Sequence, residues 1–387
     1  MAFENIAPTL ARLFHSLQTW LMPFKLPFNE EVYMLGRTYP PPEVDAEGNA
    51  PRPEDSPLYH SFTNVILFTY RCGFDSIEGC NGPSSISDKG WGCAIRATQM
   101  LLAQAVREAS AIEDVTAETG SVLSLFLDTA DAPLSLHRMV KMGQEVLAKR
   151  PGTWFGPTSG GKVASKLVKA AYDEDIAANR PPRVPFHCVA FDDGVLYKDQ
   201  VEALLTADSS GLPVLVLLCV RLGQDATIPQ SHVPLILECF RRPGFVGLSS
   251  GESTTSAFYF VAAWSGGLYY LDPHIATQPA LTNPDKVEEN TCIHQLKPHS
   301  LGWSRLNSSM CFGFLLRNKD ELNDLADWIK SGNGLTETAQ DGASSSPQWL
   351  FEVLDTTPAY AKPGGVGTDD DLSDPFDDPD EKDDSLM

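Results

Sequence analysis

Cys93 is the residue whose surroundings best fit a chemical role. It closes the segment SDKGWGC (87–93), in which two glycines around a tryptophan permit a tight turn. Apolar residues at helical spacing from 91 to 108 place Cys93 at the start of a predicted helix, where unpaired N–H groups and the helix dipole favour an anion. A thiol in such a position commonly has a pKa of ~3.5–7.5, against roughly 8.5 for a free cysteine. The segment fits a thiolate nucleophile, and it fits equally a small apolar residue that caps a core helix.

A second candidate group lies far downstream, in the segment GLYYLDPH (267–274). Residues i and i+2 of an extended strand share a face, so Asp272 and His274 are expected to point the same way. Pro273 favours extended geometry at Asp272. The carboxylate would hold the imidazole in one tautomer while the other ring nitrogen faces a thiol. Taken alone, the DPH tripeptide also fits a polar turn at a strand end, but with Cys93 it completes a Cys–His–carboxylate set.

The elements that must position these groups change in kind along the chain. Helical spacing predicts helices over 91–108 and 159–173, and short apolar or alternating runs predict strands after residue 185. The predicted strands span 186–191, 213–220, 233–240, 257–264, 267–271 and 311–316, and a short helix is predicted over 319–329. Helices followed by strands indicate an α+β domain and argue against a doubly wound parallel sheet.

Composition places the chain among globular proteins. Of its 387 residues, 42% are hydrophobic and 21% are charged, with a formal net charge of −22. This acidic excess argues against nucleic-acid binding, which needs clustered lysine and arginine. The eight cysteines are scattered without a CxxC pair, and the histidines show no HxxxH or HExxH spacing. We therefore expect no metal site and no cofactor.

The sequence also predicts a compartment and a division of the chain. No apolar run reaches the roughly 18 residues of a membrane span, and the N-terminus shows no signal-peptide pattern. The reducing cytoplasm is the expected location, because it keeps a reactive thiol free. We divide the chain into an N-terminal arm (1–33), a folded domain (34–355) and a disordered acidic tail (356–387). A stretch rich in proline and acidic residues, near 39–57, is expected to be an exposed loop of the domain.

Longer motifs around these candidates resemble one family. The runs FTYR (68–71), SDKGWGC (87–93) and YLDPH (270–274) resemble those of the autophagins, the papain-like cysteine peptidases of autophagy. Further stretches agree in the same order: MLGRTY (34–39), TWFGPTSGGKVASKL (153–167), PVLVLLCVRLG (213–223), SAFYFVAAW (256–264), FGFLLRNKDELNDLADWI (312–329) and FEVLD (351–355). The resemblance covers nearly all of residues 34–355.

The resemblance implies a papain-like α+β fold with a small extra helical lobe, in a monomeric enzyme that needs no cofactor. Its substrate would be a ubiquitin-like autophagy modifier of the GABARAP type, cut after the C-terminal glycine. Autophagins act on the free precursor, which they prime for conjugation, and on the modifier linked to phosphatidylethanolamine, which they release. The enzyme would therefore approach membranes transiently, through its substrate.

The functional residues of the family fall on matching positions in this sequence. The resemblance implies that Cys93 is the nucleophile, His274 the general base and acid, and Asp272 the orienting carboxylate. Tyr70 matches a tyrosine that helps form the oxyanion site with the Cys93 N–H.

The groove and its entrance are implied in the same way. Trp154 matches a tryptophan that covers the active-site groove, and Gly156 and Pro157 belong to the same groove segment. A narrow slot of this kind would admit a glycine-ended tail without side chains. The loop over 249–255 lacks the proline that relatives usually carry, so the loop that gates entry is expected to move differently. Its gating residues would be Ser253, Thr254 and Thr255.

Two other functions stay open at this point. One is a catalytically weak module that binds the modifier, and the other is a thiol hydrolase that acts on another ubiquitin-like modifier. A missing triad residue would mark the first, whereas all three residues are present here. Assays against a panel of modifiers would separate the second.

Overall fold

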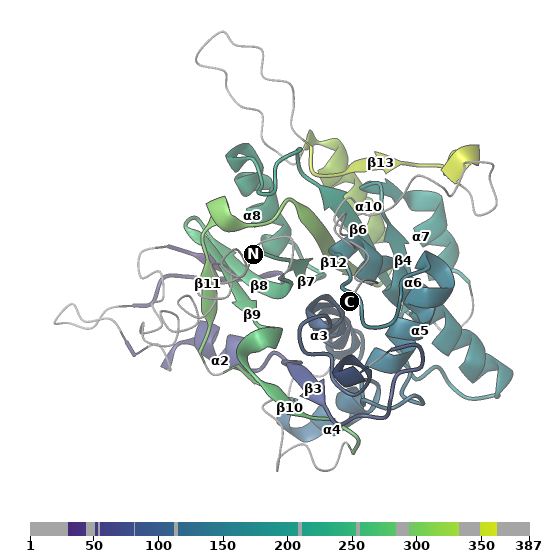
Figure 1. Cartoon of the computed structure of the whole chain (residues 1–387). Helices are drawn as coiled ribbons and strands as arrows, with labels where there is room; N and C mark the ends of the chain where they lie inside the picture. Colours follow the sequence, from purple (N-terminus) through teal and green to yellow (C-terminus); the bar gives the residue numbers. More distant parts are fainter. Residues whose placement is uncertain are drawn as a thin grey trace, which may run out of the picture.

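The computed structural model describes most of the chain between residues 30 and 361 (Figure 1). The described residues are 30–43, 51–52, 55–80, 82–111, 115–207, 211–252, 256–283, 294–295, 297–332 and 349–361. Most of the predicted arm and tail, part of the predicted 39–57 loop, and the gating residues Ser253, Thr254 and Thr255 lie outside these ranges.

Over the described part of the chain, most of the helices lie before residue 178 and most of the strands after residue 186. The helices are α2 (Pro57–Thr63), α3 (Cys93–Ala109), α4 (Val115–Ser124), α5 (Leu136–Leu147), α6 (Pro157–Ala177), α7 (Lys198–Leu205), α8 (Val233–Arg241) and α10 (Lys319–Lys330). The strands are β1 (Val32–Met34), β2 (Arg37–Tyr39), β3 (Tyr70–Cys72), β4 (His187–Phe191), β5 (Val195–Tyr197), β6 (Val214–Arg221), β7 (Phe245–Ser250), β8 (Phe258–Trp264), β9 (Gly267–Leu271), β10 (Thr277–Pro279), β11 (His299–Leu301), β12 (Ser309–Leu316) and β13 (Glu352–Leu354).

A mixed sheet forms the centre of the fold. Its strands follow the order β11-β9-β8-β7-β12-β6-β4, and β1 pairs with β8 and with β2. All of these pairs are antiparallel except β4 with β6, which is parallel. Two small sheets lie apart from it, β3 with β10 and β5 with β13. The α+β prediction is confirmed, and the sheet is not a doubly wound parallel one.

Strand β6 shows why the sheet is covered on both faces. Its residues Val214, Val216 and Leu218 belong to one buried cluster, with the side chains of α7, α8 and α10. The alternate residues, among them Leu215 and Leu217, belong to a second cluster with α3, α5 and α6. Successive side chains of a strand point to opposite faces, so a strand packed on both sides is a continuous apolar run. The sheet is therefore a layer between two groups of helices.

Most of the predicted elements are present with small shifts at their ends. The helix predicted from residue 91 begins at Cys93, so the cysteine is its first residue, and the helix predicted over 159–173 is α6. The strands predicted in the second half are found as β4, β6, β8, β9 and β12, and the predicted terminal helix is α10. Strand β7 and helix α5 were not predicted.

The strand predicted over 233–240 is wrong, because this segment forms helix α8. Its buried side chains are Leu235, Ile236, Cys239 and Phe240, which share one face at helical spacing. A proline also stands in the first turn, where a helix tolerates it. Short apolar runs fit a buried strand and a buried helix equally, which explains the error.

Two findings concern the limits of the folded part. Strand β1 begins at Val32 and joins the main sheet, so ordered packing starts just before the predicted boundary at residue 34. The division into arm, domain and tail stays a prediction.

No described helix combines the length and the apolar character that crossing a membrane requires.

Candidate active site

The turn before α3 places Cys93 at the helix start and buries it. Gly90 has a φ of +91°, a left-handed conformation that favours glycine. Gly92 is the N-cap, and a Cβ at this position would lie 2.6 Å from the side chain of Asp88. The two glycines of the motif thus allow a tight turn against a buried carboxylate. The Cys93 side chain that results is 1% exposed, with the free N–H groups of the first helical turn beside it.

His274 and Asp272 lie where β9 ends. Asp272 is extended, as predicted, but His274 belongs to a short 3-10 turn, η4 (Pro273–Ile275), and not to a strand. Oδ1 of Asp272 accepts hydrogen bonds from the ring Nδ1 of His274, at 2.6 Å, and from its backbone N–H, at 2.8 Å. One carboxylate oxygen therefore fixes both the backbone turn and the tautomer of the ring, which leaves Nε2 to face Cys93.

The charges of the pair favour an ionised thiol. Burial would raise the pKa of Cys93, but its hydrogen bond to His274 and the charge of that imidazolium outweigh burial and lower the pKa. Burial would lower the pKa of His274, but Asp272 and Cys93 stabilise the imidazolium and raise the pKa to about 10. The two shifts together favour a thiolate–imidazolium pair. A thiolate is the form of cysteine that acyl transfer requires.

Two aromatic residues complete the surroundings of the thiol. Trp154 donates a hydrogen bond from its indole N–H to Cys93 Sγ, over 3.2 Å, so its ring lies against the sulfur. Tyr70 packs edge-on against the His274 ring, with 5.2 Å between ring centroids. Burial, and then the charge of Cys93, raise the pKa of the Tyr70 phenol, which therefore keeps its proton as a donor. The structure thus brings together Tyr70, Cys93, Trp154, Asp272 and His274.

The parallel pair of β3 and β10 carries Tyr70 to the histidine. Tyr70 pairs with Thr277, three residues after His274 (Figure 1). The two strands are far apart in sequence, and no local pattern predicts their pairing. The register therefore sets the distance between the phenol and the imidazole.

The structure also shows a buried charge network that the sequence analysis missed. Arg96, one turn after Cys93, is 1% exposed. Its guanidinium contacts Asp88 at 2.6 Å and Asp128 at 2.8 Å, and both carboxylates are buried as well. The other oxygen of Asp88 accepts from the backbone N–H of Arg71, beside Tyr70. An arginine one turn after the cysteine, in a helix whose apolar spacing predicts burial, is the signal that could have indicated this network.

The second carboxylate reaches the histidine segment. Asp128 accepts a hydrogen bond from the backbone N–H of Leu281 at 2.8 Å and returns one from its own N–H to the Leu281 carbonyl at 2.7 Å. Leu281 follows β10. The Arg96 network therefore ties the nucleophile helix to the Tyr70 strand and to the chain that follows His274.

The remaining predicted site residues are placed as follows. Gly156 and Pro157 are buried at the start of α6, as its N-cap and its first residue, and their role in a groove stays a prediction. Within the described ranges, no group of three or more metal-ligating side chains is assembled. Across those ranges, the seven cysteines are free thiols.

A buried thiol, a histidine held by a carboxylate and an α+β fold with the thiol at a helix start define a papain-like cysteine peptidase. A family model for the peptidase C54 catalytic domain matches residues 56–328. The chain therefore belongs to the peptidase C54 family, which confirms the predicted resemblance to autophagins.

Curated relatives carry the same description. The "Probable cysteine protease atg4" of Schizosaccharomyces pombe is 35% identical over 265 residues, which cover 68% of this chain and 73% of the relative. The protein of the same name in Aspergillus niger is 32% identical over 344 residues, which cover 84% of this chain and 76% of the relative. The "Cysteine protease atg4" of Emericella nidulans is 29% identical over 383 residues, which cover 85% of this chain and 90% of the relative.

The charge pair predicts how fast Cys93 reacts with iodoacetamide at different pH values. In wild type, alkylation should be fast at pH 7, because the pKa of Cys93 is lowered and that of His274 is raised to about 10. In His274→Ala the imidazolium is lost and burial remains, so the thiol pKa rises and alkylation at pH 7 slows by about 10-fold or more. Modification is read at Cys93 by peptide mass spectrometry, with His137→Ala as the control. Identical pH profiles for wild type and His274→Ala would contradict the ion pair.

The Arg96 network predicts a loss of stability. Arg96→Met leaves the buried carboxylates of Asp88 and Asp128 without their cation, which should lower the free energy of unfolding by roughly 3–5 kcal/mol. The control is Arg52→Met, which breaks an exposed ion pair with Asp55 and should cost less than about 1 kcal/mol. Urea unfolding measures both. Equal losses in the two variants would contradict a structural role for the network.

Proposed function

We propose that this peptidase hydrolyses the bond after the C-terminal glycine of a ubiquitin-like autophagy modifier of the GABARAP type. The observation that carries the proposal is the cover on the nucleophile, since Cys93 is 1% exposed and Trp154 contacts its sulfur. A peptide with side chains around the cleaved bond would collide with such a cover, whereas a glycine tail is thin enough to pass. Membership of the peptidase C54 family supports the same substrate class.

The reaction follows from the arrangement of the groups. The Cys93 thiolate attacks the glycine carbonyl carbon, and the oxyanion that forms is stabilised by the Tyr70 hydroxyl and the Cys93 N–H. The imidazolium of His274 then gives its proton to the leaving amine, which departs as the thioester forms. Water, deprotonated by His274, attacks the thioester and releases the glycine carboxylate and the thiolate. Asp272 keeps the imidazole oriented throughout and stabilises its positive charge.

The same steps serve two leaving groups. When the amine belongs to the next residue of a precursor, the reaction primes the modifier for conjugation. When the amine is that of phosphatidylethanolamine, the reaction releases the modifier from the membrane. The protein residues do the same work in both, since each bond is an amide of a C-terminal glycine.

We place this activity in the cytoplasm, and the free thiols support a reducing compartment. Membranes would be approached through the lipid-linked substrate, and the enzyme would act as a monomer. Neither a metal nor a cofactor takes part in the proposed steps.

The proposal is tested with a modifier fused through its C-terminal glycine to a reporter. Wild type should release the reporter, and Cys93→Ala should lose activity by at least about 10³-fold, since it lacks the nucleophile. A fusion of ubiquitin to the same reporter serves as the substrate control. Cleavage by Cys93→Ala would overturn the nucleophile, and preference for the ubiquitin fusion would overturn the substrate. Binding of the modifier without cleavage by wild type would indicate a binding module.

The cover on the thiol predicts a change in specificity. Trp154→Ala should reduce the preference for glycine over alanine before the cleaved bond, because a smaller side chain widens the slot. We expect the glycine-to-alanine ratio of kcat/KM to fall about 10-fold, measured with two fusions that differ at this residue. Trp349→Ala, at a tryptophan that is 42% exposed, is the control and should keep the ratio. An unchanged ratio in Trp154→Ala would contradict the role of the cover.

A further inference from the structure

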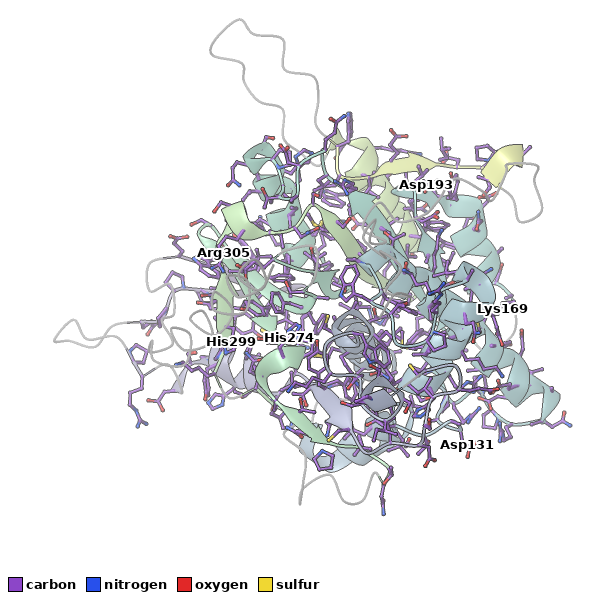
Figure 2. The ribbon with its side chains drawn as sticks, in the orientation of Figure 1. Asp131, Lys169, Asp193, His274, His299 and Arg305 are labelled. Atoms are coloured by element: carbon purple, nitrogen blue, oxygen red, sulfur yellow. The ribbon has the colours of Figure 1, made fainter. Side chains whose placement is uncertain are left out.

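Asp272 has a second oxygen, which His274 does not use. Both hydrogen bonds from His274 end on Oδ1. Oδ2 faces another histidine, His299, whose Nδ1 lies 3.7 Å away. Figure 2 shows the labelled His274 and His299 close to each other. Each of them contacts Asp272. The catalytic carboxylate thus lies between two imidazoles.

The register of the sheet explains this placement. Strands β9 and β11 are antiparallel, and His299 is paired directly with Tyr270. Asp272 is two residues after Tyr270, just past the end of β9, which makes it the diagonal neighbour of His299. Tyr270 also packs edge-on against the His299 ring, with centroids 5.7 Å apart. The tyrosine therefore holds the ring while its nitrogen faces the carboxylate.

Gln295, which lies shortly before His299 in the sequence, also fixes the backbone of Asp272. Gln295 is 3% exposed, and its carbonyl oxygen accepts from the Asp272 N–H at 3.0 Å. Its amide nitrogen donates to the carbonyls of Tyr270 and Lys297, at 3.3 and 2.9 Å. A fully bonded side-chain amide thus fixes the chain at the point where β9 ends.

We propose that His299 is a positioning residue for catalysis, which holds Oδ2 of Asp272 while His274 holds Oδ1. A carboxylate held on both oxygens cannot rotate about its Cβ–Cγ bond, so the His274 ring keeps its plane as it gains and loses a proton. The His299 contact of 3.7 Å is long for a hydrogen bond, and catalytic hydrogen bonds commonly shorten once substrate is bound. The inference deepens the proposed function, because it concerns the same site.

The electrostatics of the carboxylate agree with this role. Burial would raise the pKa of Asp272, but the hydrogen bonds from His274 and the nearby His299 outweigh burial, and the pKa lies below the ordinary value. The titratable groups near this end of β9 include His274 and Tyr270, and Cys93 and Tyr70 face the far side of the His274 ring. Glu252 and Arg305 act in turn on Tyr270.

The test compares His299→Phe with His299→Asn. Phenylalanine keeps the ring packing on Tyr270 but removes the donor, whereas asparagine keeps a donor near the position of Nδ1. We expect His299→Phe to lower kcat about 10- to 100-fold with KM within twofold, and His299→Asn to recover most of kcat. We also expect His299→Phe to slow alkylation of Cys93 at pH 6, since a loosely held carboxylate stabilises the imidazolium less. The control is His60→Phe, at a histidine that packs edge-on against Tyr59 in α2.

Several outcomes would overturn the proposal. Equal kcat and equal alkylation profiles in wild type and His299→Phe would show that the contact does not position Asp272. Equal losses in His299→Phe and His299→Asn would show that packing alone matters. If His299→Phe does not fold, His299→Leu takes its place, because leucine matches asparagine in shape without a donor. Alkylation needs no substrate, so a His299 effect without cleavage of any modifier would overturn the proposed substrate and leave this inference standing.

Discussion

Burying the Arg96 guanidinium is costly unless opposite charges and hydrogen bonds compensate it, and two aspartates do so. Burial raises the pKa of Asp88 in spite of the nearby cation, so the loss of solvation is the larger effect on this carboxylate. Each aspartate uses its other oxygen on the backbone of a different segment, one beside Tyr70 and one after His274. The requirement to neutralise one buried cation therefore also fixes the relative positions of Cys93, Tyr70 and His274.

This constraint matters because the small sheet that carries Tyr70 would have little stability by itself. The pair of β3 and β10 has two short strands, and an isolated two-stranded sheet is marginally stable in water. Asp88 accepts a hydrogen bond from the backbone of Arg71 in β3, and Asp128 accepts one from Leu281, just after β10. Tyr70 in β3 also packs edge-on against the His274 ring. The buried network and the small sheet thus support each other. Precise placement of the catalytic groups needs both.

The sequence was most informative where a local pattern decides the structure. The glycines before Cys93 predict a turn and a helix start, and the apolar run of β6 predicts a buried strand. Helix α8 was mistaken for a strand because its apolar run is short and fits both periodicities. The roles of Arg96 and His299 could not be read from the sequence, since they depend on burial and on the register of distant strands. Local spacing identifies reactive groups, whereas long-range pairing selects the residues that hold them.

The resting site combines two properties that usually oppose each other. Burial disfavours a thiolate, yet the imidazolium of His274 and the N–H of Trp154 stabilise it in a sulfur that is almost fully covered. The lowered pKa of Cys93 therefore favours the thiolate before substrate arrives. Under the proposed function, what substrate binding must supply is access, because a glycine tail would have to reach Cys93 beneath Trp154. Discrimination among substrates would then lie in passing this cover.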